Sequence, residues 1–99
     1  MNRNLIPSSN FIRKIKRIIK KHPELENTIN RILDILVEDP FDSKLKTHKL
    51  KGKFEGCYSC VVGYDLRIIL KFVESADKES NLKSENILLL TIGTHDEVY

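Results

Sequence analysis

The sequence predicts an α+β fold in which an N-terminal helical hairpin packs on one face of a three- to four-stranded antiparallel sheet. Two observations predict it. The first half of the chain carries two successive apolar stripes with helical spacing, and the second half carries β-branched and aromatic runs separated by turn residues. The expected element order is (β)ααβββ.

Composition limits the class of protein. With 99 residues the chain is expected to form one domain, residues 1–99. Apolar residues make up 40% of it, enough for one modest core, and the 31% of charged residues indicate a water-soluble protein. No apolar run approaches the roughly 20 residues of a membrane span, and no secretion signal is visible. Two cysteines in such a chain favour a reduced, cytoplasmic protein without membrane contacts.

Charge is distributed unevenly along the chain. Residues 1–53 contain 13 Lys or Arg and 6 Asp or Glu, a net charge of +7, whereas residues 54–99 contain 4 and 8, a net charge of −4. A basic half of this strength favours a polyanion or an acidic protein as partner. A solvated lysine-rich surface explains it about equally well.

The first expected elements are a short strand and a basic helix. Leu5-Ile6 fits an edge strand that ends at Pro7. The helix is expected to begin at the capping residues of 8–10 and to end at His22, because Pro23 follows. Its apolar stripe consists of Phe11, Ile15, Ile18 and Ile19, and its other faces carry Arg13, Lys14, Lys16, Arg17, Lys20 and Lys21.

A second helix is expected from Pro23 to the Asp39-Pro40 stop, with almost no linker after the first. Its apolar stripe consists of Leu25, Ile29, Ile32, Leu33 and Leu36. The stripes of both helices need an apolar surface to cover, which one face of a sheet provides. Residues 41–53 follow as a lysine-rich loop without a clear period.

The sheet is expected to centre on residues 54–72, two strands joined by a turn at residues 63–65. In the second strand, alternation separates an apolar face, Leu66, Ile68, Leu70 and Phe72, from a face with Asp65, Arg67, Ile69 and Lys71. We expect Asp65 and Arg67 to project together. The polar stretch 74–86 is expected to be a mobile connection, and the apolar run 87–92 a buried strand.

Cys57 and Cys60 form a C-x-x-C motif. Residues three apart on a strand point to opposite faces, so the two sulfurs are not expected to bind one metal ion. A redox C-x-x-C motif normally opens a helix, and none is expected there. We therefore expect two small packing residues.

Three segments together carry a family resemblance: His48-Lys49-Leu50-Lys51-Gly52, the Gly63–Ile69 stretch and the C-terminal Gly93-Thr94-His95-Asp96-Glu97-Val98-Tyr99. In this order and spacing they resemble the RelE/ParE superfamily of type II toxin–antitoxin toxins, and most closely its YafQ branch. The resemblance covers nearly the whole chain.

The resemblance implies a ribosome-dependent mRNA endoribonuclease that cuts in the A site and inhibits translation, without a metal or other cofactor. In that chemistry the ribose 2′-hydroxyl attacks the adjacent phosphate and leaves a cyclic phosphate and a 5′-hydroxyl. It needs a base for the 2′-hydroxyl, a cation for the developing charge and an acid for the leaving oxygen.

By position in the motifs, the resemblance assigns proton transfer to His48 and His95, phosphate charge to Arg67, and base stacking or orientation to Tyr99. Asp65 would orient a histidine or raise its pKa. The expected RNA-binding residues are Lys46, Lys49, Lys51, Lys53 and Lys71. The YafQ branch carries a further Asp and His in the strand before the turn, where this chain has Ser59 and Val61.

The implied partners are a cognate antitoxin, mRNA on the ribosome with contacts to rRNA, and operator DNA only through the antitoxin. Two alternatives remain open. A ParE-like poison of DNA gyrase would share the fold without needing acid–base residues, and a catalytically weak member would only bind its antitoxin.

Overall fold

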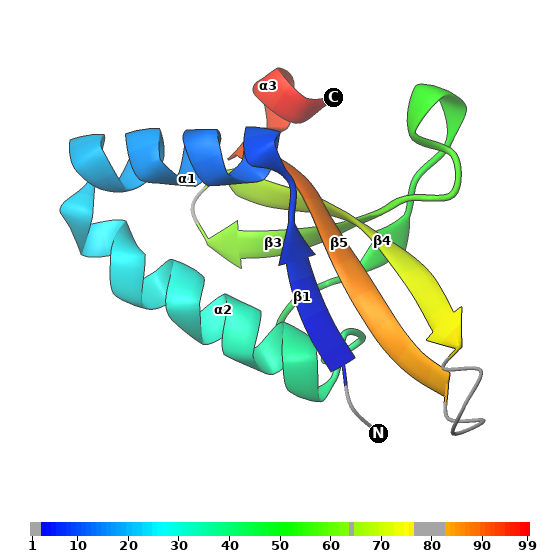
Figure 1. Cartoon of the computed structure of the whole chain (residues 1–99). Helices are drawn as coiled ribbons and strands as arrows, with labels where there is room; N and C mark the ends of the chain where they lie inside the picture. Colours follow the sequence, from blue (N-terminus) through cyan, green and yellow to red (C-terminus); the bar gives the residue numbers. More distant parts are fainter. Residues whose placement is uncertain (1–2, 64, 77–82) are drawn as a thin grey trace.

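The computed structural model describes residues 3–63, 65–76 and 83–99 of the chain. Within these residues, five strands form one sheet in the order β1-β5-β4-β3-β2 (Figure 1). The strands are β1 (Arg3–Pro7), β2 (His48–Lys49), β3 (Tyr58–Gly63), β4 (Leu66–Ala76) and β5 (Lys83–Thr94). The α+β class is confirmed. The sheet is mixed rather than wholly antiparallel, because β1 runs parallel to β5.

Both predicted helices are present with the predicted ends. Helix α1 spans Ser9–Lys21, and the backbone N–H of Phe11 donates to the Ser8 hydroxyl oxygen over 3.0 Å. The Ser8 hydroxyl in turn donates to the Leu90 carbonyl of β5 over 2.8 Å, which ties the start of α1 to the sheet. The second helix starts with a 3-10 turn, Pro23–Leu25, before α2 (Glu26–Glu38).

The core lies between the two long helices and one face of the sheet. Figure 1 shows α1 and α2 on the same side of the strands. The buried cluster contains Phe11, Leu25, Ile29, Ile32, Leu36, Leu45, Cys60, Val62, Leu66, Ile68, Leu70, Ile87, Leu89 and Ile92. The predicted apolar face of β4 is therefore the face that the helices cover, and we call the opposite face the front face.

Two segments predicted as connections are partly strands. β4 continues to Ala76 and β5 begins at Lys83, so much of the polar stretch 74–86 is paired, with Glu74 opposite Glu85. The prediction of a wholly mobile connection was wrong there, because backbone pairing needs no apolar side chains; residues 77–82 lie outside the described residues. In the lysine-rich loop, His48 and Lys49 form the edge strand β2.

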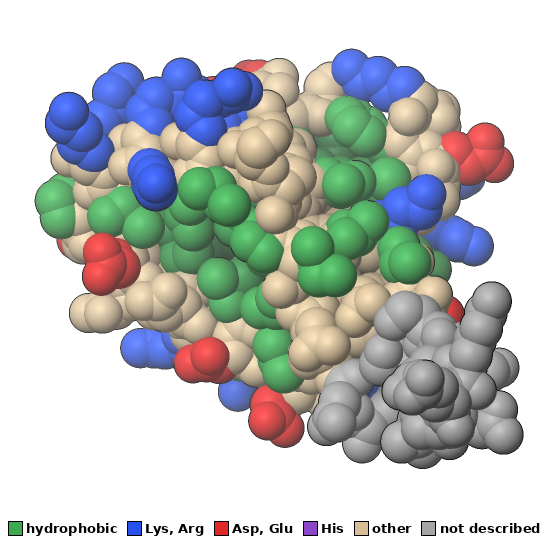
Figure 2. Space-filling model, in the orientation of Figure 1, with side chains coloured by type: hydrophobic (Ala, Val, Ile, Leu, Met, Phe, Trp, Pro, Cys, Tyr) green, Lys and Arg blue, Asp and Glu red, His purple; other side chains and the backbone are tan. Residues whose placement is uncertain are grey.

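The exposed side of α1 is strongly basic. Figure 2 shows Lys and Arg side chains gathered along this helix, with hydrophobic side chains between α1 and α2. None of the helices in the described residues is long and apolar enough to cross a membrane.

Candidate functional site

The front face of β4 carries Arg67, Ile69 and Lys71, which alternate with the core residues of the strand. Ile69 is fully buried although the long helices cover the other face. Arg67 is half-buried, and its Nη1 donates to the Leu66 carbonyl over 3.0 Å. This face is therefore partly covered, and the C-terminus of the chain contributes to the cover.

The short helix α3 (His95–Val98) follows β5 directly and is closed by a capping box. The Thr94 N–H donates to Glu97 Oε1 over 3.0 Å, and the Glu97 N–H donates to Thr94 Oγ1 over 3.3 Å. A Cβ on Gly93 would lie 3.2 Å from side-chain atoms of both Glu97 and Val98, so glycine allows α3 to pack close to β5. The turn places His95 and Tyr99 at the sheet.

Tyr99 connects this C-terminal turn to the front face. Its hydroxyl donates a hydrogen bond to Ser59 Oγ on β3, and its ring lies edge-on to the His95 ring with 4.5 Å between the centroids. Ser59 is fully buried, whereas Tyr99 keeps 37% of its surface exposed. Ser59 also pairs with His48 across the β2–β3 ladder, which places the His48 side chain on the same face.

We call this set the front-face cluster: His48, Ser59, Arg67, His95 and Tyr99. The sequence predicts catalytic roles for all of these residues except Ser59. Ser59 has no chemical signature of its own, and only the strand register and the position of the C-terminus reveal its contact with Tyr99. The capping box, in contrast, is readable from the Thr94-x-x-Glu97 spacing.

Both histidines of the cluster are exposed. His48 Nδ1 lies 3.1 Å from the Lys46 carbonyl oxygen, so a proton on Nδ1 satisfies this contact and makes Nε2 the acceptor of the ring. His95 Nδ1 lies 3.7 Å from Asp96 Oδ1, and 57% of the His95 side chain is exposed. Each ring can therefore reach a substrate on this face.

Asp65 does not join the cluster. It precedes β4 in the turn, where the β3–β4 register shifts, and it is among the residues that line a groove on the side of α1. That Asp65 and Arg67 project together stays a prediction; within the described residues no ion pair joins them. Asp65 contributes through its backbone, because its carbonyl accepts a hydrogen bond from the His95 N–H over 3.2 Å.

The predicted RNA-binding lysines are all exposed, but they do not share one face. Lys71 lies on the front face by alternation in β4. Lys49 pairs with Tyr58, whose ring packs against the core cluster, so Lys49 points away from the face of His48. The Lys53 ammonium lies 5.2 Å from the centre of the Phe54 ring. Figure 1 shows α3 and the loop before β3 projecting at the same edge of the molecule.

The family model for YafQ, the bacterial toxin of a type II toxin–antitoxin system, matches residues 3–99. The chain belongs to the YafQ family. The resemblance seen in the sequence is thereby confirmed, and the protein is a toxin of the type II toxin–antitoxin class.

Several solved toxin structures have a similar fold. YafQ from E. coli strain BL21(DE3) is 21% identical, with 98% of each chain covered and a TM-score of 0.73. The E. coli DinJ–YafQ toxin–antitoxin complex gives 21% identity, 100% and 99% coverage and a TM-score of 0.72. The YoeB–YefM complex from Staphylococcus aureus is 18% identical, with 96% of this chain and 99% of that chain covered and a TM-score of 0.67. At these identities the likeness shows the fold alone. No curated protein matches the sequence significantly.

Proposed function

We propose that this YafQ-family toxin is a cytoplasmic, ribosome-dependent mRNA endoribonuclease that cuts in the A site and thereby inhibits translation. The observation that carries the proposal is the contact chain from His95 through Tyr99 to Ser59. It fixes the C-terminal residues on the sheet face that also presents His48 and Arg67. Two imidazoles and a guanidinium on one face are the groups that RNA cleavage through the 2′-hydroxyl requires.

In this mechanism the two histidines divide the proton transfers. One takes the proton of the attacking 2′-hydroxyl, and the other gives a proton to the leaving 5′-oxygen. Histidine suits both roles because its ordinary pKa lies near neutral pH. The acceptor Nε2 of His48 supports a role as base. No metal ion takes part in these steps.

Arg67 and Tyr99 serve the transition state and the substrate. The guanidinium of Arg67 compensates the additional negative charge of the phosphorane. Tyr99 has an exposed ring for stacking on a base, while its hydroxyl is held by Ser59. Asp65 acts as a positioning residue through the His95 N–H rather than through its carboxylate.

Exposed lysines would hold the RNA backbone at this face by neutralising phosphates. Lys71 lies on the front face, and Lys46, Lys51 and Lys53 belong to the segment that leads into β3. Lys49 points to the opposite face of the sheet, so its RNA contribution can be compared with that of Lys71.

The proposed protein partner is a cognate antitoxin, as in the DinJ–YafQ and YoeB–YefM complexes of the related toxins. Contacts to rRNA would accompany mRNA binding, and operator DNA would be reached only through the antitoxin.

Induced expression in cells without the antitoxin tests the proposed function. Wild type should arrest growth and produce codon-phased mRNA ends by 5′-end mapping, and His95→Ala should do neither. His22→Ala is the matched control, because His22 pairs with Glu24 far from Tyr99 in the sequence and is outside the cluster. Growth arrest by all three proteins with intact mRNA would overturn the nuclease assignment.

One observation favours the two alternative functions, a poison of DNA gyrase and a member that only binds its antitoxin. Ser59 and Val61 stand where the YafQ branch carries Asp and His, and Ser59 is buried under Tyr99. A gyrase poison would arrest growth with DNA damage signalling, and His95→Ala would leave that arrest unchanged. A member that only binds its antitoxin would leave growth and mRNA unaffected when expressed alone.

A further inference from the structure

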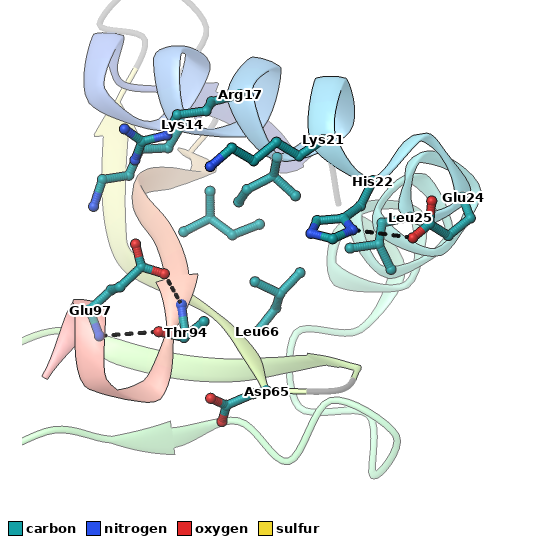
Figure 3. A pocket seen from close by; sticks show the side chains of 12 residues that line it. Lys14, Arg17, Lys21, His22, Glu24, Leu25, Asp65, Leu66, Thr94 and Glu97 are labelled. Atoms are coloured by element: carbon teal, nitrogen blue, oxygen red, sulfur yellow. Dashed lines mark hydrogen bonds and ion pairs between the residues drawn. The ribbon is translucent and has the colours of Figure 1, made fainter.

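The two histidines of the front-face cluster are held in different ways. His95 follows the capping box of Thr94 and Glu97, whose hydrogen bonds Figure 3 shows. His48 lies instead in β2, a strand of only two residues at the edge of the sheet. Its ring contacts the backbone of Lys46, whose carbonyl oxygen lies 3.1 Å from Nδ1. The conformation of Lys46 therefore affects how this ring is held.

Lys46 has a backbone conformation that is rare for a lysine. Its φ angle is +50°, in the left-handed region, and within the described part of the chain the other residues with positive φ are glycines. A residue with a Cβ is disfavoured in this region, because the Cβ lies too close to the following carbonyl oxygen. Such a conformation persists where the surrounding structure fixes it, and it is found most often at functional sites.

The residues on both sides of Lys46 are anchored to the rest of the molecule. Leu45 is fully buried in the core, and its carbonyl accepts a hydrogen bond from the Val61 N–H of β3 over 2.7 Å. On the other side, the Thr47 hydroxyl donates to the Pro40 carbonyl over 2.6 Å. The chain therefore passes from the core to β2 between two fixed points, and these contacts hold Lys46 in the left-handed turn.

The contact with Lys46 selects one tautomer of the neutral His48 ring. A carbonyl oxygen only accepts hydrogen bonds, so Nδ1 must carry the proton in order to donate to it. The other tautomer would set the lone pair of Nδ1 against the oxygen. With the proton on Nδ1, Nε2 has the free lone pair that a general base needs, and a histidine in the wrong tautomer cannot take the proton.

We propose that Lys46 is a positioning residue for His48. Its left-handed backbone holds the carbonyl that fixes the Nδ1–H tautomer, and this keeps Nε2 ready to accept the proton of the ribose 2′-hydroxyl. The identity of the proton donor rests on the proposed function, whereas the selection of the tautomer does not. Lys46 thus has a role in its backbone that is separate from the phosphate contact proposed for its side chain.

Substitutions at Lys46 that all remove the charge separate the backbone from the side chain. Glycine adopts the left-handed region without a steric cost, alanine less readily, and the β-branched valine least readily. The test series is therefore Lys46→Gly, Lys46→Ala and Lys46→Val. Lys44→Gly and Lys44→Val form the control pair, because Lys44 is an exposed lysine of the same loop whose φ is not positive.

Nitrogen NMR chemical shifts of the imidazole report the His48 tautomer in the free toxin, at a pH where the ring is neutral. Wild type, Lys46→Gly and both Lys44 variants should show the Nδ1–H form. Lys46→Val should shift toward the Nε2–H form that a free histidine favours, with Lys46→Ala between them. An unchanged tautomer in Lys46→Val, the Nε2–H form in wild type, or equal shifts in Lys46→Gly and Lys46→Val would overturn the proposal.

Circular dichroism checks that each variant is folded. If Lys46→Val is not folded, the comparison of Lys46→Ala with Lys46→Gly decides the same question.

Cleavage of mRNA on ribosomes then relates the tautomer to catalysis. The kcat of Lys46→Val should be about tenfold below that of Lys46→Gly, which is part of what a general base contributes. Their KM values should be similar, because both variants lack the ammonium. Equal kcat values with different tautomers would overturn the role in proton transfer. Absence of cleavage by wild type would overturn the proposed function, and the tautomer in the free toxin would still decide the role of Lys46.

Discussion

The hydroxyl of Tyr99 donates a hydrogen bond to Ser59 Oγ, 40 residues earlier on β3. The bond connects the α3 turn, which follows β5, to strand β3 on the far side of β4. The Tyr99 ring also touches the His95 ring. The hydrogen bond between Tyr99 and Ser59 therefore helps to hold a candidate catalytic histidine in place.

The Tyr99–Ser59 bond should be measurable by a double-mutant cycle with Tyr99→Phe and Ser59→Ala. Each change removes one partner, so the coupling free energy in urea unfolding should be about 1 kcal/mol. Tyr58→Phe, at an aromatic residue outside the front-face cluster, is the control and should show no coupling to Ser59→Ala. Effects of Tyr99→Phe and Ser59→Ala that simply add would show that the bond does not contribute to folding.

The capping box should support α3 in a pH-dependent manner. The hydrogen bonds from Thr94 to the Glu97 carboxylate lower the Glu97 pKa below its ordinary 4.5. The stabilisation is therefore present above pH 4.5 and is lost as the pH falls through the lower, folded-state pKa. Hydrogen exchange at the amides of α3 measures it, and protection that does not change over this range would contradict the prediction.

Substitutions at Glu97 should separate the hydrogen bond from the charge. Glu97→Gln keeps an acceptor for the Thr94 N–H, whereas Glu97→Ala removes it and should destabilise the turn by about 1 kcal/mol. We expect Glu97→Ala to reduce mRNA cleavage much more than Glu97→Gln. Equal activity of the two variants would show that the capping box does not position His95.

Cys60 should be protected from thiol reagents until the protein unfolds. Burial raises the pKa of its thiol from 9.0 to about 12, whereas Cys57 lies before β3 and is only half-buried. Between these pH values the unfolded state loses its thiol proton first, so stability falls as the pH rises from about 9. In urea unfolding, the stability of Cys60→Ala should fall less steeply as the pH rises above about 9 than the stability of wild type or Cys57→Ser. Identical slopes would contradict the burial of the thiol.

The two faces of the sheet should differ in RNA binding. Lys71→Ala removes a cation of the front face, and it should lower the slope of log affinity against log salt by about 0.7 for a single-stranded RNA. Lys49→Ala removes the same charge from the other face and should change the slope little. A larger effect of Lys49→Ala would place the RNA elsewhere.

Much of the fold was predictable because local rules agree with the tertiary structure. The α1 helix begins after Ser8 and ends before Pro23, as capping and proline geometry require. Alternation in β4 separated Ile68 from Arg67 correctly. These features depend on neighbours in the sequence.

What the sequence could not predict depends on contacts between distant segments. The parallel pairing of β1 with β5 joins Leu5 to Ile87, and a two-residue apolar run carries no information about such a partner. The register shift between Val61 and Gly63 in β3 also depends on how the two strands pair. The contact of Ser59 with Tyr99 joins residues that lie 40 positions apart in the sequence.

The proposed cleavage of mRNA in the A site can be measured with purified toxin on ribosomes programmed with a defined mRNA. Wild type and His22→Ala should cut the mRNA in the A site and leave a 2′,3′-cyclic phosphate and a 5′-hydroxyl, which polynucleotide kinase labels without prior phosphatase treatment. His95→Ala should leave the mRNA intact. Cleavage by His95→Ala at the wild-type rate, or products with 5′-phosphates, would exclude the proposed mechanism.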